Sequence, residues 1–356
     1  MAYTNIDDPS AFFQTTLYTG NNTGGASLNV TNSGNSDLQP DWVWIKSRSG
    51  ASNHNCSDSS RGATKHLAQN ITYQEEIVSG ITGYNSDGFT LGTNGDSNGN
   101  GTTFVAWQWK CNAGTTATNT TGSVDSVVQV NSDAGFSIVT FDSASSGNFS
   151  VGHGLGVQPA MIITKNRESA SNWWTWHKGL TGGNSNTSYV VALERTTAEA
   201  SYANAWGAGV TSSVFGMQSG NTATASNDYV AYCFAEKQGF SKFGNYVGTG
   251  NANGPMIATG FKPAFVMLKP TTFTEEWAMI DTKRNPFNQA MKQLKANSNG
   301  AEYDGASVTN GIDILSNGFK VRTSRTEINA TTHTYIYMAF AENPFVTSTG
   351  IPTTAR

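Results

Sequence analysis

One run of apolar and small residues occurs three times along the chain, at residues 104–110, 229–236 and 335–342. Each copy mixes aromatic, β-branched and small residues, and each is too short for a helix of ordinary length. Such a run is typical of a strand that is buried on both faces. Three copies of one core strand predict a chain built from three structural units.

A second pattern recurs at a fixed place in each unit. Three segments begin with proline and end with lysine at the same interval, and a polar, Gly-rich span precedes each: 40–46, 159–165 and 263–269. Proline cannot donate a backbone hydrogen bond, so it suits the first residue of a strand. We expect each segment to enter the core at its proline and to return to solvent at its lysine, which is Lys46, Lys165 or Lys269.

Turn signals separate many short apolar stretches. Asp87-Gly88 and Asn317-Gly318 are hairpin signals because both residue types tolerate positive φ. Short strands divided by Gly, Asn and Ser turns, without long helical periodicity, favour an all-β fold over a parallel α/β fold. The sequence therefore predicts three tandem β-sandwich repeats of a jelly-roll or lectin-like type.

The repeats divide the chain as follows. We expect β-sandwich repeats over 1–111, 135–238 and 239–345, a Thr/Asn/Gly-rich linker over 112–134, and a polar C-terminal tail over 346–356. The linker has room for one added strand at residues 127–130.

Composition narrows the class of protein and its partners. Charged residues make up only 13% of the chain, while aromatic residues stand at 11%, which indicates a folded protein and not a disordered one. The net charge of -4 offers no cationic field, so nucleic acid is not an expected partner. No apolar run approaches the roughly 20 residues of a membrane span, and residues 1–8 lack the features of a signal peptide. We expect synthesis in the cytoplasm without a signal peptide and no membrane insertion.

The metal-ligating residue types show no metal-binding spacing. Cys56, Cys111 and Cys233 are an odd number in different repeats, and they predict three free thiols. The loop 94–100 could bind calcium weakly, but a solvated hairpin loop is the favoured interpretation. No cofactor or metal is predicted.

Catalytic constellations are equally hard to build. The five histidines fall at different places in the repeat, and His153 lies in a Gly-rich turn without a visible partner. The adjacent acids Glu75-Glu76 and Glu275-Glu276 would point to opposite faces of a strand, so neither pair alone makes an acid/base couple. The sequence predicts no catalytic residues and a protein that is not an enzyme.

Aromatic clustering gives the one candidate binding residue. In the run from Trp173 to Trp176, two tryptophans align with apolar residues of the third repeat and are expected in the core. Trp174 aligns with Ala278, so it is the expected exposed member and could stack on a sugar ring. Trp174 is therefore the predicted glycan contact.

Taken together, the recurring segments resemble a family of virion structural proteins from tailed phages of marine bacteria, particularly cyanophages, usually labelled tail-fibre-like. The resemblance rests on residues 40–46, 85–92, 104–110, 229–236 and 335–345, and it extends to 1–14 and 346–356. It implies a multi-copy particle component that is made in the host cytoplasm, resides in the virion and binds other virion proteins of the tail or capsid. It implies no catalytic motif.

Three functions follow from the pattern and the resemblance. The leading hypothesis is a non-enzymatic tail-fibre or appendage component that contacts the host cell surface, with glycan as the expected target. The alternatives are a capsid head-decoration or head-fibre protein, and a host polysaccharide depolymerase. Long heptads are absent, so the homo-oligomer, expected to be a trimer, would form through sandwich faces.

Overall fold

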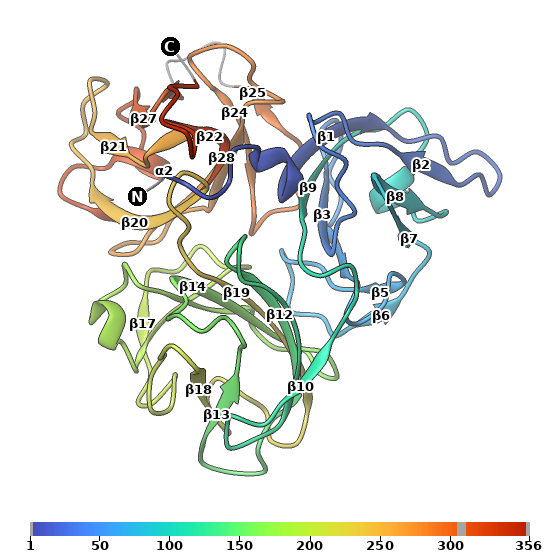
Figure 1. Cartoon of the computed structure of the whole chain (residues 1–356), viewed down its shortest axis with the longest axis vertical. Coiled ribbons are helices and arrows are strands. Elements are labelled where there is room, and N and C mark those ends of the chain that lie inside the picture. The colour runs from blue at the N-terminus through green and yellow to red at the C-terminus, as the bar shows by residue number, and fades with distance from the viewer. Residues whose placement is uncertain (1–2, 305–310, 354–356) are drawn as a thin grey trace.

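The computed structural model describes residues 3–304 and 311–353 and shows three β-rich lobes around a common centre (Figure 1). All pairings between the labelled strands are antiparallel, which agrees with the many short strands and hairpin turns of the sequence. The α-helices of the described residues are α1 (Gly95–Asn98) and α2 (Thr326–Asn329), and the 3-10 turns are η1 (Pro9–Ala11) and η2 (Gly183–Ser185). The predicted all-β class is confirmed.

The first lobe has a four-stranded main sheet and a three-stranded small sheet. The main sheet runs in the order β1 (Phe13–Thr19), β9 (Thr103–Trp109), β3 (Trp42–Ser47), β4 (Asn55–Asp58). The small sheet is β2 (Leu28–Val30), β8 (Gly88–Leu91), β7 (Ile81–Asn85). Two short strands, β5 (Lys65–His66) and β6 (Glu76–Ile77), pair beside them.

The other lobes repeat this plan. The second main sheet is β10 (Ala117–Asn119), β11 (Ser126–Asn131), β12 (Phe136–Asp142), β19 (Asp228–Phe234), β14 (Met161–Asn166), β15 (Trp174–His177), β16 (Tyr189–Ala192), β17 (Ala200–Ser201), and its small sheet is β13 (Asn148–Gly152), β18 (Val214–Gln218). The third main sheet is β20 (Ser241–Val247), β28 (Thr334–Pro344), β22 (Phe261–Pro270), β23 (Ala278–Asp281), β24 (Lys292–Lys295), β25 (Tyr303–Asp304), and its small sheet is β21 (Met256–Ala258), β27 (Gly318–Val321), β26 (Ile312–Leu315).

The recurring aromatic run is the inner strand of each main sheet. Strands β9, β19 and β28 each have two partners in the main sheet. One is β1, β12 or β20, and the other is the strand that follows the recurring proline (β3, β14) or contains it (β22). The strand register places three residues at one equivalent position: Trp109 opposite Phe13 and Trp42, Phe234 opposite Phe136 and Met161, and Phe340 opposite Ser241 and Phe265. The prediction of a strand buried on both faces is confirmed.

These three equivalent aromatic residues meet at the centre of the molecule. The ring centroids of Trp109, Phe234 and Phe340 lie 5.7 to 6.3 Å from one another. They belong to one hydrophobic cluster that draws on all three lobes. Further clusters lie between the main and small sheets of the first and second lobes. The lobes therefore share a core at the centre, where burial of large aromatic surfaces is the main stabilising term.

The segment 112–134 differs from the expected linker. It carries two strands, β10 and β11, and β11 pairs along its whole length with β12. Strand β11 covers the edge that β12 would otherwise expose, and Val128 and Gln129 of β11 are buried there. Of the expected tail over 346–356, the last three residues lie outside the described residues, and Ser348 bonds to Asp7.

Candidate functional site

One backbone contact recurs at each interface between lobes. The amide of an acidic residue donates to a carbonyl of the next lobe: Glu75 to Arg167 (2.9 Å), Glu199 to Thr271 (2.8 Å) and Glu302 to Arg48 (2.8 Å). The first lobe thus binds the second, the second binds the third, and the third returns to the first. This cyclic pattern closes the three lobes into a ring.

Two of these acids also join buried charges across the interface. Glu75 lies 2.8 Å from Arg61 of its own lobe and 2.9 Å from Arg167 of the second lobe. Burial alone would raise the pKa of Glu75, but the hydrogen bonds and charges of Arg167 and Arg61 outweigh it and bring the pKa to about 2. Glu302 contacts Arg48 and Arg284 in the same way. The acids are held ionised as structural partners.

The three recurring lysines are fully buried, so the prediction that they return to solvent is wrong. Lys165 donates to Thr72 O of the first lobe (2.9 Å), and Lys269 donates to Thr196 O of the second lobe (2.8 Å). Backbone carbonyls of the neighbouring lobe replace water around these two ammonium groups, whereas Lys46 Nζ donates to Ser47 O of its own lobe (2.9 Å). Burial lowers the pKa of Lys46, Lys165 and Lys269 to about 8.

Two histidines also bridge lobes as neutral rings. His54 Nδ1 accepts a hydrogen bond from the Trp44 indole (2.7 Å), and His54 Nε2 lies 3.0 Å from Ser298 O of the third lobe. His177 Nε2 lies 3.1 Å from Tyr337 O, again of the third lobe. The carbonyl partners require the proton on Nε2. Burial lowers the pKa of His54 to about 3 and that of His177 to about 4.

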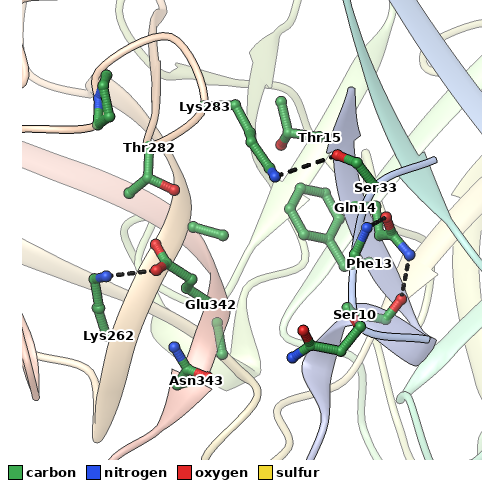
Figure 2. A pocket seen from close by; sticks show the side chains of 15 residues that line it. Ser10, Phe13, Gln14, Thr15, Ser33, Lys262, Thr282, Lys283, Glu342 and Asn343 are labelled. Carbon is green, nitrogen blue, oxygen red and sulfur yellow. Dashed lines mark hydrogen bonds and ion pairs between the residues drawn. The ribbon is translucent and has the colours of Figure 1, made fainter. Parts of the chain in front are cut away.

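A cleft of about 430 Å³ lies between the first and third lobes (Figure 2). Its walls come from β1, from the loop 33–35, and from the third-lobe strands β22 and β28 with the turn after β23. Lys262 and Glu342 form an ion pair on one wall. Lys283 reaches across from the third lobe and its Nζ lies 3.5 Å from Ser33 Oγ.

Thr15 is the unusual residue of this cleft. Its side chain is 4% exposed, and its Oγ1 has no hydrogen-bond partner among the described residues. Thr15 lies opposite Trp107 in the first lobe. The equivalent pairs are Ile138 opposite Tyr232 in the second lobe and Phe243 opposite Met338 in the third, so the other two lobes have an apolar residue at the position of Thr15. A buried hydroxyl without a partner costs about 1 to 3 kcal/mol. A polar residue at a position that is apolar in the other two repeats is the sequence signal that would have pointed to this cleft.

Residues 8–344 match the model of a protein family described as a domain of unknown function, DUF7483. The chain belongs to this family. The matched range covers strands of all three lobes, so the three-lobed fold corresponds to a single DUF7483 domain. No curated protein and no solved structure matches the chain.

The tryptophan run of this DUF7483 domain divides between core and surface. Trp173 and Trp176 are fully buried, and the Trp173 indole donates to Ala68 O of the first lobe (3.0 Å). Trp174 is half-buried and meets Tyr202 edge to face, with ring centroids 5.4 Å apart. Tyr202 is 40% exposed. Trp174 stays a predicted glycan contact, with Tyr202 as its neighbour.

The remaining candidate groups have structural surroundings. Cys56, Cys111 and Cys233 are free, as predicted, and the structure buries all three. His153 is buried, with Nε2 3.2 Å from Thr211 O. The loop 94–100 folds into α1, where the Asn94 side chain accepts from the Asp96 amide. Within residues 3–304 and 311–353, no cluster of three or more His, Cys, Asp or Glu side chains is suited to hold a metal ion, and no helix has the length and hydropathy of a membrane span.

Proposed function

We propose that this DUF7483 protein is a non-enzymatic structural component of a phage particle, in a tail fibre or similar appendage that contacts the host cell surface. The proposed target is glycan, and the proposed binding residue is Trp174. Other virion proteins and further copies of the chain, in a homo-oligomer expected to be a trimer, are the proposed partners. The sequence resemblance to tail-fibre-like virion proteins supports the particle location.

The observation that carries the proposal is the closed ring of three lobes. Equivalent backbone contacts join the lobes in a cycle, and the equivalent residues Trp109, Phe234 and Phe340 meet at its centre. Such a chain resembles a closed trimer made from one polypeptide, and symmetric building blocks are the usual units of protein assemblies. A rigid unit with three related faces suits a structural component that keeps a fixed place in the particle and exposes a binding surface to the host cell.

We further propose that each lobe is a β-sandwich of the jelly-roll or lectin-like kind. Each lobe pairs one main sheet with one small sheet. In the first lobe, Val43 and Phe104 of the main sheet belong to the same buried cluster as Phe89 and Leu91 of the small sheet. An apolar layer between two sheets is the defining feature of a sandwich.

The use of the buried charged groups favours a structural role. Arg61, Glu75, Lys165 and His177 are typical catalytic residue types, yet each makes a hydrogen bond to a neighbouring lobe. A general acid or base must have the atom that gives or takes the proton within reach of the substrate. Glu75, the acid with the strongest set of partners, is held by two arginines.

The ring also suits a second location, the capsid. A chain with internal three-fold repetition fits a three-fold or quasi-three-fold position of a capsid lattice, where a head-decoration protein would sit. Labelling of intact particles with an antibody against the folded protein separates the two locations. Label on the tail supports the appendage, and label at capsid lattice points overturns it in favour of decoration.

Glycan contact and catalysis are tested on the purified full-length chain. On a glycan array, wild-type protein should bind and Trp174→Ala should lose most of the signal, while Tyr73→Ala, at an exposed tyrosine of the first lobe, should bind like wild type. Equal signals from wild type and Trp174→Ala would remove Trp174 from the proposal. Release of reducing ends from host polysaccharide by the wild-type protein would overturn the non-enzymatic assignment.

A further inference from the structure

We propose that the free edge of β1, beside the cleft between the first and third lobes, accepts an extended strand from a partner protein. The added strand would pair with β1 as β11 pairs with β12 within this chain. This inference goes beyond the proposed function and does not depend on it.

The edge of β1 has unused backbone groups. Strand β1 is the last strand of its sheet, and only β9 pairs with it. Lys110 N donates to Phe12 O (3.0 Å) and Gly20 N donates to Thr102 O (2.9 Å), so the even-numbered residues between them face β9. The backbone groups of Phe13, Thr15 and Leu17 face away from β9, and no described residue bonds to them. An unpaired row of this kind is a template for one more strand.

The equivalent edges of the other lobes are occupied. Strand β11 covers β12 from Phe136 to Phe141. In the third lobe, Phe243 N donates to Glu236 Oε1 (3.0 Å) and Ser241 N donates to Lys237 O (2.9 Å), so the preceding turn caps the first part of β20. Among the three edges in the described structure, β1 is the one that stays open along its length.

Strand β11 shows what an added strand would look like. Gln129 lies opposite Ile138, is fully buried, and donates to Ser59 Oγ (3.0 Å) and Ser60 Oγ (2.8 Å) of the first lobe. The side-chain Oε1 of Gln129 accepts from the backbone amides of Asn112 (2.9 Å) and Gly114 (3.0 Å). One amide side chain thus joins the covering strand to the neighbouring lobe.

The cleft beside β1 repeats the surroundings of Gln129. The buried ion pairs Asp58–Arg61 and Asp281–Arg284 fix the correspondence between the first and third lobes. The residues that follow each aspartate are Ser59 and Ser60 in one case, and Thr282 and Lys283 in the other. Thr282 and Lys283 both line the cleft (Figure 2). They stand where the partners of Gln129 stand in the occupied interface.

Thr15 supplies a separate observation that points to a ligand. Thr15 is the first-lobe equivalent of Ile138, and Gln129 lies opposite Ile138 in the second lobe. A strand added to β1 would therefore place its equivalent of Gln129 opposite Thr15. The Thr15 hydroxyl is buried at the cleft and has no partner among the described residues. An amide side chain opposite Thr15 would meet the hydroxyls of Thr15 and Thr282 and the ammonium group of Lys283. The partner strand is therefore expected to carry Gln, or a similar hydrogen-bonding residue, at this place.

The shape of the cleft selects a single strand. The loop 33–35 forms one wall and the third lobe forms the other, around a volume of about 430 Å³. The edge of a second folded sheet, as in a dimer of two β1 edges, would meet both walls. The geometry therefore points to an extended segment of a partner protein, recognised by backbone hydrogen bonds and by one buried side chain.

The test uses the full chain and a fluorescent peptide with the sequence of residues 124–133, which contains β11. Fluorescence anisotropy should show saturable binding. Leu17→Pro should weaken peptide binding at least about tenfold. The Leu17 amide faces away from β9, so the proline side chain would block the added strand without removing a hydrogen bond within the sheet. Asn245→Pro, at the equivalent place on β20, is the matched control and should bind like wild type.

A second pair of changes keeps the proposal testable if Leu17→Pro fails to fold. Thr15→Val in the protein and Gln129→Ala in the peptide should each weaken binding about fivefold, and the two together should cost little more than one alone, because they remove the same hydrogen bond. Absence of saturable binding, equal binding by Leu17→Pro and Asn245→Pro, or additive effects of the second pair would overturn the proposal. So would a β1-dependent dimer in size-exclusion chromatography with light scattering, since it would make a second copy the occupant.

Discussion

Acid should destabilise the ring through its buried histidines. His54 and His177 each lie at an interface with the third lobe, and His153 is buried within the second. Burial lowers their pKa values to about 3, 4 and 4. In the unfolded chain, histidine has a pKa of about 6.5. As the pH falls below that value, the unfolded state takes up protons that the folded state refuses, so stability falls with pH.

The size of the effect follows from these values. Between pH 7 and pH 5 an unfolded imidazole goes from about one-quarter protonated to almost fully protonated, while the three folded imidazoles stay mostly neutral. Each histidine should then cost about 2 kcal/mol of unfolding free energy, and the three together about 6 kcal/mol. Glu75 acts in a lower window: its pKa of about 2 means that its contribution is lost only as the pH falls below about 4.5. The loss between pH 7 and pH 5 therefore belongs to the histidines.

Urea unfolding followed by tryptophan fluorescence at pH 7, 6 and 5 measures this loss directly. His177→Gln keeps a donor for Tyr337 O and removes the titrating imidazole, so its loss between pH 7 and pH 5 should be smaller than that of the wild type by about 2 kcal/mol. His333→Gln, at a half-buried histidine against Phe273, is the control. Equal stability of the wild type at pH 7 and pH 5, or an equal loss in His177→Gln and wild type, would refute the reasoning.

Three further changes test other parts of the structure. Glu75→Gln leaves Arg61 and Arg167 with a neutral partner and should lower the free energy of unfolding at pH 7 by about 1 to 3 kcal/mol. The control Glu76→Gln, at an exposed neighbour, should change this free energy by less than about 0.5 kcal/mol. Similar values for both variants would show that the interface ion pairs do not stabilise the fold. Trp109→Ala should cost about 3 to 5 kcal/mol and lower the melting temperature of all three lobes in one calorimetric transition, and a separate transition for the first lobe would contradict the shared core. The thiols of Cys56, Cys111 and Cys233 should react with a thiol reagent only after unfolding, and rapid reaction of any of them in the native protein would show that its burial is wrong.

The repeated core strand could be predicted from sequence because its chemistry is local. A run of aromatic and β-branched residues fits a position buried on both faces, and Trp109, Phe234 and Phe340 lie there as expected. The buried Trp173 and Trp176 could be predicted by the same reasoning, since alignment of the repeats separates core positions from variable ones. The free cysteines followed instead from their odd number in different repeats.

The closure of the ring could not be predicted in this way. Arg48 and Glu302 meet although 254 positions separate them, and neither residue carries a local signal of its partner. The recurring Lys165 and Lys269 misled for the same reason. A lysine at the end of an apolar strand ordinarily extends into water, but here carbonyls of the adjacent lobe accept hydrogen bonds from both ammonium groups. The cleft at Thr15 is likewise formed by two lobes, so its prediction would require the strand register of the first and the third lobe.

Under the proposed function the chain is encoded by a phage, and cryo-EM of intact particles of that phage tests the functional account most directly. The account predicts three-lobed density that fits this chain on the tail or a tail appendage, in several copies, with the second-lobe face around Trp174 turned outward. Density at capsid lattice points would contradict the appendage, and particles without any density for the chain would contradict its proposed role as a structural component.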